Sequence, residues 1–436
     1  MGRQGGFWFS RERTQHWFQR VAEFGFWQFT SQAIQILTGF LLVRWMTVES
    51  YAQYGLVLGF QNMLGQLVDL GFSSSIIALV GSRVGDRFAV GRYVGAALSL
   101  RKSLLWVCLP FGGLAFAWFA YHHHWTMRSS VALYLSIVAY VYFQGWVSCY
   151  STPLIMHHRM SAYYVPAVLW NAIKLTACWA AQSYAIMSAT LVCGLNAVSN
   201  VLTGAFYRSR GGKHISKCPE VDSDSQREIR SFVAPLLPGM IFYAFQSQIQ
   251  VFLIAAFGKS ESVGEVAALG RLGQLFLFLS AFNGMLLVPV IARAPRARVV
   301  VRYVQATALT IICIALVCGS AWAFPKVYLS FLGPQYKHLP DEMVLSLIAS
   351  SLWLMSSTLY SFNNARRWVF HGTAFCNIAG MLFLQGFLIS RMDLSNTRSV
   401  LLFGIITGGF PILVFLGTAI YGFNKDLRGA AETKSS

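Results

Sequence analysis

The chain has 436 residues, of which 56% are hydrophobic and only 11% charged, and its formal net charge is +18. Soluble proteins carry about 25% charged residues, so this composition excludes a soluble globular protein and predicts a membrane protein. The basic residues lie in short segments between apolar runs, which excludes a separate nucleic-acid-binding domain.

The first 23 residues are polar and basic, and they carry apolar side chains at helical spacing. We expect an amphipathic lead-in that lies on the cytoplasmic membrane surface. The apolar run that follows is too long for the hydrophobic region of a signal peptide, so it should stay in the membrane.

Two apolar runs, Phe24–Trp45 and Tyr54–Val80, are joined by the short turn Thr47–Gln53 and predict a transmembrane hairpin. The first run would be a helix about 33 Å long, enough to cross a bilayer. In each run the polar residues share one helical face. The first stripe is Gln28, Ser31, Gln32 and Gln35, and the second is Asn62, Gln66, Asp69 and Ser73.

These polar stripes cannot both face lipid, because unpaired polar groups are costly there. One interpretation is packing, in which the side chains join neighbouring helices at about 0.6 kcal/mol each. The other is a water-filled cavity through which a polar cargo passes.

Ten further apolar runs follow, which predicts an all-α protein with about twelve transmembrane helices. A polar segment, 207–230, divides them into an N-terminal lobe (1–206) and a C-terminal lobe (231–436) of six helices each. The runs are Leu104–Tyr121, Val131–Ile155, Tyr164–Ala181, Ala185–Phe206, Ser231–Phe257, Ala267–Ile291, Tyr303–Phe324, Met343–Ser361, Thr373–Ser390 and Val400–Tyr421.

The distribution of basic residues predicts the orientation. With both termini inside, the inner segments hold 25 of the 34 Lys and Arg residues and the outer loops hold 6. The positive-inside rule therefore places both termini in the cytoplasm. The two halves also contain similar segments, because Ser31-Gln-Ala-Ile-Gln35 resembles Ser247-Gln-Ile-Gln250. With an even number of spans in each half, both halves have the same orientation in the membrane.

Several stretches resemble a known family. The segment Arg44-Trp-Met-Thr-Val-Glu-Ser-Tyr-Ala-Gln-Tyr-Gly55, followed by Leu67-Val-Asp-Leu-Gly-Phe-Ser73, is similar to the opening of polysaccharide biosynthesis proteins of the O-antigen flippase type. These belong to the multidrug/oligosaccharidyl-lipid/polysaccharide exporter superfamily. Ser262–Gly270, leading to Val288-Pro289, and Phe331–Tyr336 agree with this resemblance.

The resemblance implies two six-helix lobes around a central cavity that opens alternately to either side of a bacterial inner membrane. The implied cargo is an oligosaccharide linked through diphosphate to a polyprenyl chain, and the implied partners are the lipid bilayer and polysaccharide polymerase or other assembly proteins. The chain departs from the family at Gln250, where a charged residue is common in the seventh span. This departure weakens any ion-coupling role for that span.

Three basic residues are candidates to bind a diphosphate. Lys174 lies near the middle of the fifth span, where a charge costs about 3 kcal/mol, so it either faces the cavity or pairs with Asp69. Arg271 lies near the outer end of the eighth span and either faces the cavity or extends to the interface. Arg44 ends the first span at the outer surface, where we expect it to extend to the interface or to have a structural role.

Asp69 is the one acidic residue deep within a predicted span. It either binds a coupling proton or cation, or holds the hairpin to a neighbouring helix, which is the role we favour. The carboxamides are candidates to bind sugar hydroxyls or, alternatively, to join helices. They are Gln28, Gln32, Gln35, Asn62, Gln66, Gln246 and Gln250.

No cofactor, metal site or disulfide framework is expected. The eight cysteines form no C-x-x-C pair, and His122, His123 and His124 are adjacent residues without ligand spacing. The short outer loops argue against a polymerase or another membrane enzyme. A multidrug exporter of the same superfamily remains the main alternative, although the basic residues in the spans favour an anionic cargo.

Overall fold

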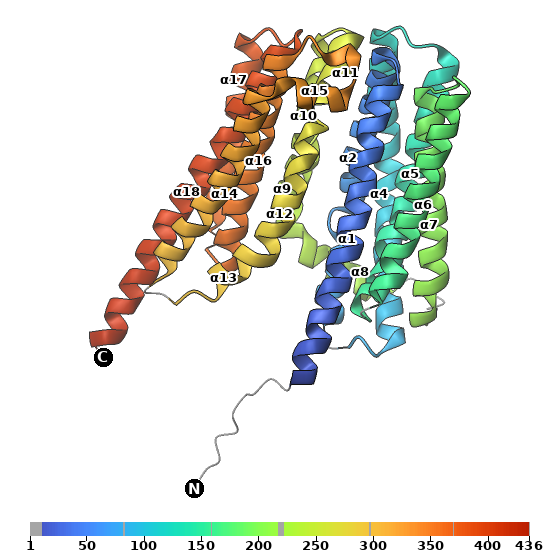
Figure 1. The fold of residues 1–436 in the computed structure, drawn as a ribbon. Helices are drawn as coiled ribbons and strands as arrows, with labels where there is room; N and C mark the ends of the chain where they lie inside the picture. Colours follow the sequence, from blue (N-terminus) through green and yellow to red (C-terminus); the bar gives the residue numbers. More distant parts are fainter. Residues whose placement is uncertain are drawn as a thin grey trace.

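The computed structural model describes residues 11–435 except 82, 158, 217–221, 296–297 and 369; for residues 11–24, 160, 371 and 425–435 it describes the backbone alone. Residues 1–10 of the predicted amphipathic lead-in lie outside the described residues, and the backbone of residues 11–23 forms the start of a helix. The described chain is all helical and forms two lobes, as predicted (Figure 1).

Seven helices form the N-terminal lobe. α5 and α7 pack closely along their length, and α1 packs mainly against α6. The helices are α1 (Arg11–Trp45), α2 (Val48–Asp69), α3 (Phe72–Val80), α4 (Arg87–His122), α5 (Met127–Met156), α6 (Met160–Ser183) and α7 (Ala189–Gly211).

Short helices alternate with long ones in the second half, where α16 and α18 pack closely together. The helices are α8 (Ser223–Val233), α9 (Leu237–Gln246), α10 (Ile249–Phe257), α11 (Ser260–Leu269), α12 (Phe276–Phe282), α13 (Val288–Ala292), α14 (Val299–Ala323), α15 (Pro325–Leu332), α16 (Pro340–Ala365), α17 (His371–Arg391) and α18 (Thr397–Ser435). The short helices η1 (Gly212–His214), η2 (Ala234–Leu236), η3 (Leu272–Leu275), η4 (Asn283–Leu287) and η6 (Pro334–Tyr336) lie between them.

Among the described residues, nine helices are long and apolar enough to cross a membrane, and a bent pair ending in α10 brings the number to ten. α1 and α6, at the positions of the first and fifth predicted spans, have 35 and 24 residues. The polar side chains of α1 and α6 make these two helices less apolar than the other spans. When α1 and α6 are included, each predicted apolar run corresponds to a helix or a helix pair in the structure.

Local sequence explains where the helices begin and where they break. Thr47 caps α2 by accepting a hydrogen bond from the backbone N–H of Ser50 at 3.2 Å, and Thr126 and Ser188 cap α5 and α7 in the same way. The predicted second span is two helices, because Leu70 and Gly71 adopt the left-handed conformation between α2 and α3. Glycine tolerates this conformation at little cost.

The polar segment 207–230 contains helices. α7 continues to Gly211, and α8 packs against α3 and α4 of the N-terminal lobe. Asp222 caps α8 and pairs with Arg92 of α4. Hydrogen bonds from Ser225 and Arg92 lower the pKa of Asp222 to about 2, so this carboxylate stays ionised at physiological pH.

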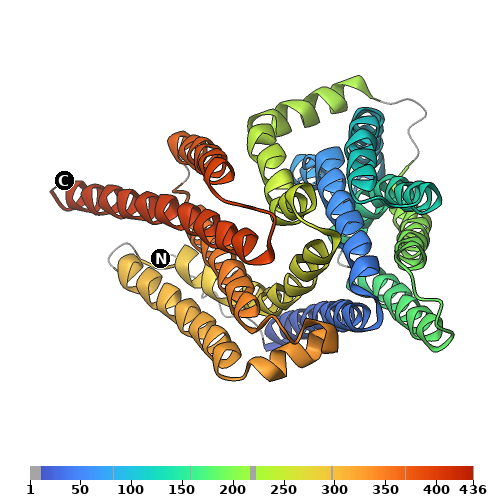
Figure 2. The ribbon, with the colours of Figure 1, turned by 90° about the horizontal axis from the view of Figure 1, so that it is seen from above.

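The helices of the two lobes converge at one end of the molecule and diverge toward the other (Figure 1). The diverging end is the one where α1 begins and α18 ends, and we call it the terminal face. The opposite end is the distal face. Seen from above, α2 and α11 lie side by side at the centre, between the two groups of helices (Figure 2).

Candidate functional site

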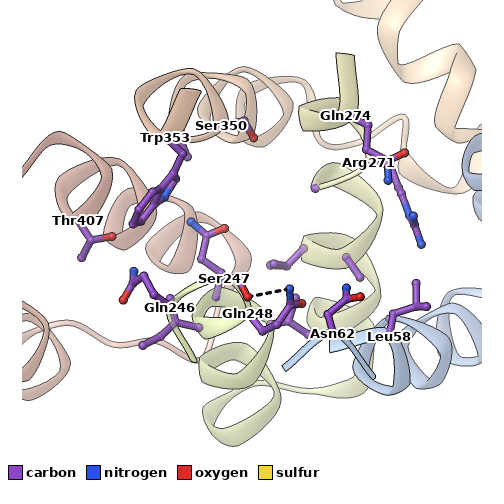
Figure 3. Close-up of a pocket in the computed structure, with 18 of the residues that line it drawn as sticks. Leu58, Asn62, Gln246, Ser247, Gln248, Arg271, Gln274, Ser350, Trp353 and Thr407 are labelled. Carbon is purple, nitrogen blue, oxygen red and sulfur yellow. Dashed lines mark hydrogen bonds between the residues drawn. The ribbon is translucent and has the colours of Figure 1, made fainter. Parts of the chain in front are cut away.

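A cavity of about 630 Å³ lies between the two lobes and is the candidate site (Figure 3). Its wall comes from α2, from the α9–α10 pair, from α11 and η3, and from α16 and α18. The residues that carry its polar and aromatic character are Tyr51, Asn62, Gln66, Tyr243, Gln246, Ser247, Gln248, Gln250, Arg271, Gln274, Ser350, Trp353 and Thr407.

One basic side chain and six carboxamides define the chemistry of this cavity. Among the described residues that line it, Arg271 is the one charged group. Carboxamides and hydroxyls both donate and accept hydrogen bonds, as sugar hydroxyls do. Trp353 and Tyr243 add flat aromatic surface. The cavity therefore suits a polar, uncharged group attached to an anion.

Arg271 connects the lobes at the cavity wall. It follows α11 on the C-terminal lobe, and its Nε donates a hydrogen bond to the hydroxyl of Tyr51 on α2 at 2.8 Å. Its guanidinium carbon also lies 5.7 Å from the centre of the Tyr54 ring. A guanidinium carries five N–H donors, so these contacts leave others for an anionic ligand.

The α9–α10 pair places its polar residues in the cavity by a break in the helix. The two helices meet at an angle of 50° at Ser247 and Gln248. The Nε2 of Gln248 donates to the Oγ of Ser247 at 3.4 Å (Figure 3). Gln250 approaches α18 at Gly404, where a Cβ would lie 1.7 Å from its Nε2, so a larger residue at position 404 would displace the end of the Gln250 side chain.

α17 supports the polar face of α9 from behind. The hydroxyl of Tyr243 accepts a hydrogen bond from Nδ2 of Asn377 at 2.7 Å. The Oε1 of Gln246 accepts one from Nε2 of Gln385 at 2.6 Å. The Nε2 of Gln246 has no partner although the side chain is buried, which leaves it as a free donor at the cavity wall.

Five of the candidate residues named from the sequence come together in this cavity. They are Asn62, Gln66, Gln246, Gln250 and Arg271. The cavity is also lined by five polar or aromatic residues that were not among the candidates from the sequence, namely Gln248, Gln274, Ser350, Trp353 and Thr407. Gln274 follows Arg271 by one helical turn, and this spacing could have identified it as a cavity residue. Trp353 and Thr407 are isolated in apolar helices, so no sequence pattern identified them.

The α1 carboxamides do not line the cavity. Gln28 accepts a hydrogen bond from the hydroxyl of Tyr164 on α6 at 2.7 Å, Gln32 is half-buried, and Gln35 is exposed. Their face continues to Gly39, where a Cβ would lie 3.4 Å from Oε1 of Gln274. The α1 stripe therefore extends from the cavity wall toward the terminal face.

Lys174 lies inside the N-terminal lobe, and it is not among the described residues that line the cavity. Its Nζ donates to Oδ1 of Asn196 on α7 at 3.4 Å, and Asn196 donates to Gln61 of α2 at 3.0 Å. Of the two alternatives for Lys174, the pairing with Asp69 does not occur in the structure. Lys174 is held by carboxamide oxygen, and Asp69 has a different partner.

Asp69 pairs with Arg101 of α4 and also accepts a hydrogen bond from Ser73 at 2.5 Å. Arg101 precedes the predicted apolar run Leu104–Tyr121, but α4 begins at Arg87, and Arg101 is only 3% exposed. The pair joins the end of α2 to α4, which is the kind of contact that we expected of a structural Asp69. Arg44, at the distal end of α1, is exposed.

The lobes close against each other at the distal face, in a region that we call the distal seam. A Cβ on Gly55 of α2 would lie 2.6 Å from the Cβ of Ala267 on α11, so glycine permits this close approach. Nε2 of Gln335 donates to the carbonyl oxygen of Val43 at 2.7 Å. Nε2 of His123 lies 2.8 Å from the carbonyl oxygen of Ala255.

Solved structures of membrane transporters share this fold. The lipid II flippase MurJ in an inward closed conformation matches with a TM-score of 0.67 at 11% identity, over 92% of this chain and 89% of that chain. An inward-facing multidrug resistance MATE family transporter of the MOP superfamily matches with 0.64 at 13% identity, over 93% and 96%. An outward-facing MATE family transporter matches with 0.51 at 15% identity, over 96% and 97%.

These identities establish the fold alone. No protein-family model matches the sequence. No curated protein matches it significantly.

Proposed function

We propose that this protein moves a polyprenyl-diphosphate-linked oligosaccharide across the membrane by alternating access, as a flippase for surface polysaccharide or O-antigen synthesis. The observation that carries the proposal is the pairing of Arg271 with six carboxamides in one cavity between two lobes. The cation would bind the diphosphate, and the carboxamides would bind the sugars without requiring one particular sugar. The cargo is amphiphilic, so its polyprenyl chain would remain in the lipid.

The polar face of α1 fits this route. Gln28, Gln32 and Gln35 follow one another along α1 between the terminal face and the cavity wall. A sugar chain entering from the terminal face would exchange water for these side chains before it reached Arg271. In this proposal the terminal face is cytoplasmic, and the distal seam separates the cargo from the outside until the lobes rearrange.

A drug is the second candidate cargo, because MATE family transporters share the fold. The cavity charge separates the two proposals. A cationic drug would require cavity carboxylates, yet none occurs among the described residues that line this cavity. The charge therefore favours an anionic cargo.

The test uses full-length protein in vesicles that contain a fluorescently labelled polyprenyl-diphosphate oligosaccharide. Dithionite destroys only the label in the outer leaflet, so complete loss of fluorescence reports transbilayer exchange. We expect exchange with the wild type and little exchange with Arg271→Gln, because the loss of a charged hydrogen bond of about 1.5–3 kcal/mol weakens binding about 10- to 150-fold. Arg44→Gln is the matched control, since Arg44 is an exposed arginine on the other lobe.

Two results would overturn the proposal. One is exchange by folded Arg271→Gln at the wild-type rate. The other is transport of a cationic dye by the wild type without exchange of the lipid-linked oligosaccharide, which would favour drug export.

A further inference from the structure

A second, smaller hollow lies on the N-terminal lobe, in the groove between α4 and α5. Its volume is about 130 Å³. Exposed Lys102 and Tyr142 form its rim, and buried Arg101 lies in its wall. None of its lining residues is shared with the central cavity, so the transport proposal does not account for it.

Arg101 presents unused hydrogen-bond donors in this groove. The side chain is 3% exposed, and its Nη1 pairs with Asp69. Its Nε and Nη2 are buried and have no partner. A buried donor without an acceptor costs free energy, so a ligand that supplies oxygen acceptors would be stabilised here. Gly145 of α5 keeps the space open, because a Cβ there would lie 3.1 Å from Nε.

The groove lies at the depth of lipid head groups on the terminal side. Trp146 follows the distal start of α5 at Met127 by 19 residues, which is about 29 Å of helix and close to the roughly 30 Å thickness of a bilayer core. Arg101 and Lys102 directly precede the apolar run of α4. The guanidinium carbon of Arg208 lies 4.4 Å from the Trp146 ring centre. Tryptophan and arginine are typical of this interface.

We propose that the α4–α5 groove binds the phosphate head group of an anionic phospholipid from the leaflet at the terminal face. Nε and Nη2 of Arg101 donate to the phosphate oxygens, and Lys102 contacts the same group from the rim. Val68, Leu105 and Val141 supply apolar surface for the start of the acyl chains.

The charge of the groove favours an anionic lipid over a zwitterionic one. Asp69 balances the charge of Arg101, and Lys102 leaves one net positive charge among these three groups. This charge matches a lipid with one net negative charge, such as phosphatidylglycerol. Phosphatidylcholine would bring its own cation into a groove that already contains one.

Native mass spectrometry of the full-length protein, released from detergent with added phosphatidylglycerol or phosphatidylcholine, tests the proposal. We expect phosphatidylglycerol to be retained, and we expect Lys102→Gln to weaken its retention about tenfold, the effect of about one charged contact. Lys213→Gln is the matched control, because Lys213 is also exposed and basic but lies outside the groove.

Arg101 requires a paired substitution, because Arg101→Gln alone would leave Asp69 without its partner. The double variant Asp69→Asn/Arg101→Gln removes both charges and should lose phosphatidylglycerol like Lys102→Gln. Equal retention of both lipids by the wild type would overturn the proposal. Equal loss in Lys213→Gln would do the same.

Discussion

The Nε of Arg271 on the C-terminal lobe lies 2.8 Å from the hydroxyl of Tyr51 on the N-terminal lobe. The one charged group among the described cavity-lining residues thus also joins the two lobes. A bound anion would accept hydrogen bonds from the remaining N–H donors of the same guanidinium. Cargo binding and lobe separation are therefore expected to be coupled through Arg271.

Removing the Tyr51 hydroxyl should separate these two roles. Tyr51→Phe keeps the Arg271 charge but removes one hydrogen bond between the lobes, worth about 1 kcal/mol. We expect cargo affinity to change less than threefold, while Arg271→Ala weakens it at least tenfold. Binding of lipid-linked oligosaccharide to protein in nanodiscs measures both. Equal losses in the two variants would contradict separate roles.

A side chain at Gly55 should open the distal seam. The new Cβ of Gly55→Ala would lie 2.6 Å from the Cβ of Ala267, and such overpacking costs about 1–3 kcal/mol. The conformational equilibrium should shift by a factor of about 5 to 150 toward lobes separated at the distal face. Spin labels at positions 127 and 326 should report a longer distance.

Gly65→Ala on the same helix is the control for this prediction, because nothing lies within 4 Å of its Cβ position. This variant should leave the label distance unchanged and raise stability slightly, since alanine favours a helix. An unchanged label distance in Gly55→Ala would contradict the prediction, because it would show that the distal seam accommodates the extra methyl group without separation of the lobes.

Breaking the Asp69–Arg101 pair should reduce protein abundance. Asp69→Asn leaves buried Arg101 without its counter-charge, at a cost of about 3 kcal/mol. Abundance should fall while the residual protein still transports, and Asp69→Asn/Arg101→Gln should restore much of the abundance. Immunoblots of membranes, paired with the vesicle assay, measure both quantities. Normal abundance with transport that no longer responds to a pH gradient would instead indicate proton coupling at Asp69.

Acid should weaken the distal seam through His123. Burial lowers the pKa of His123 below its usual 6.5, with smaller contributions from His122 and His124. Its neutral ring donates from Nε2 to Ala255 and accepts at Nδ1 from Ser260. A histidine with a lowered pKa favours the closed form above pH 6.5. This contribution decreases as the pH falls below 6.5 toward the folded pKa.

Val48 lies against Gly264 across the seam, and cysteine is smaller than valine. The alkylation rate of Val48→Cys by a water-soluble maleimide, corrected for thiol ionisation, should therefore rise between pH 7 and pH 5. His123→Gln should remove most of this rise. His124→Asn should preserve it, because asparagine tolerates the positive φ of that position. A pH dependence that persists in His123→Gln would assign the effect to another group, such as the His338–Glu265 pair.

Reporter fusions test the orientation. Gly211, at the end of α7, should report a cytoplasmic position, as should Ser436, while Lys259 and Pro334 should report an external one. The reason is the excess of basic residues on the terminal side. An external signal at Gly211 would reverse the proposed direction of the cargo path.

The sequence by itself determined the helical membrane class, the two lobes and the polar face of α2. These features follow from the composition and from the 3.6-residue period, which are local properties. Asn62 and Gln66 were found in this way, because residues on one helical face share an environment. Arg271 was found because placing a charged side chain within a membrane span costs free energy, so such a residue often has a functional role.

The tertiary structure decided which helices face each other and therefore which polar group meets which. Lys174 and Asp69 are opposite charges in predicted spans of one lobe, yet Lys174 is held by Asn196 and Asp69 by Arg101. Arg101 looked like a loop residue because helix α4 extends beyond its apolar run. Trp353 and Thr407 enter the cavity only because α16 packs against η3 and α18 packs against α10. Such contacts depend on the packing of residues far apart in the chain, which periodicity within one helix does not encode.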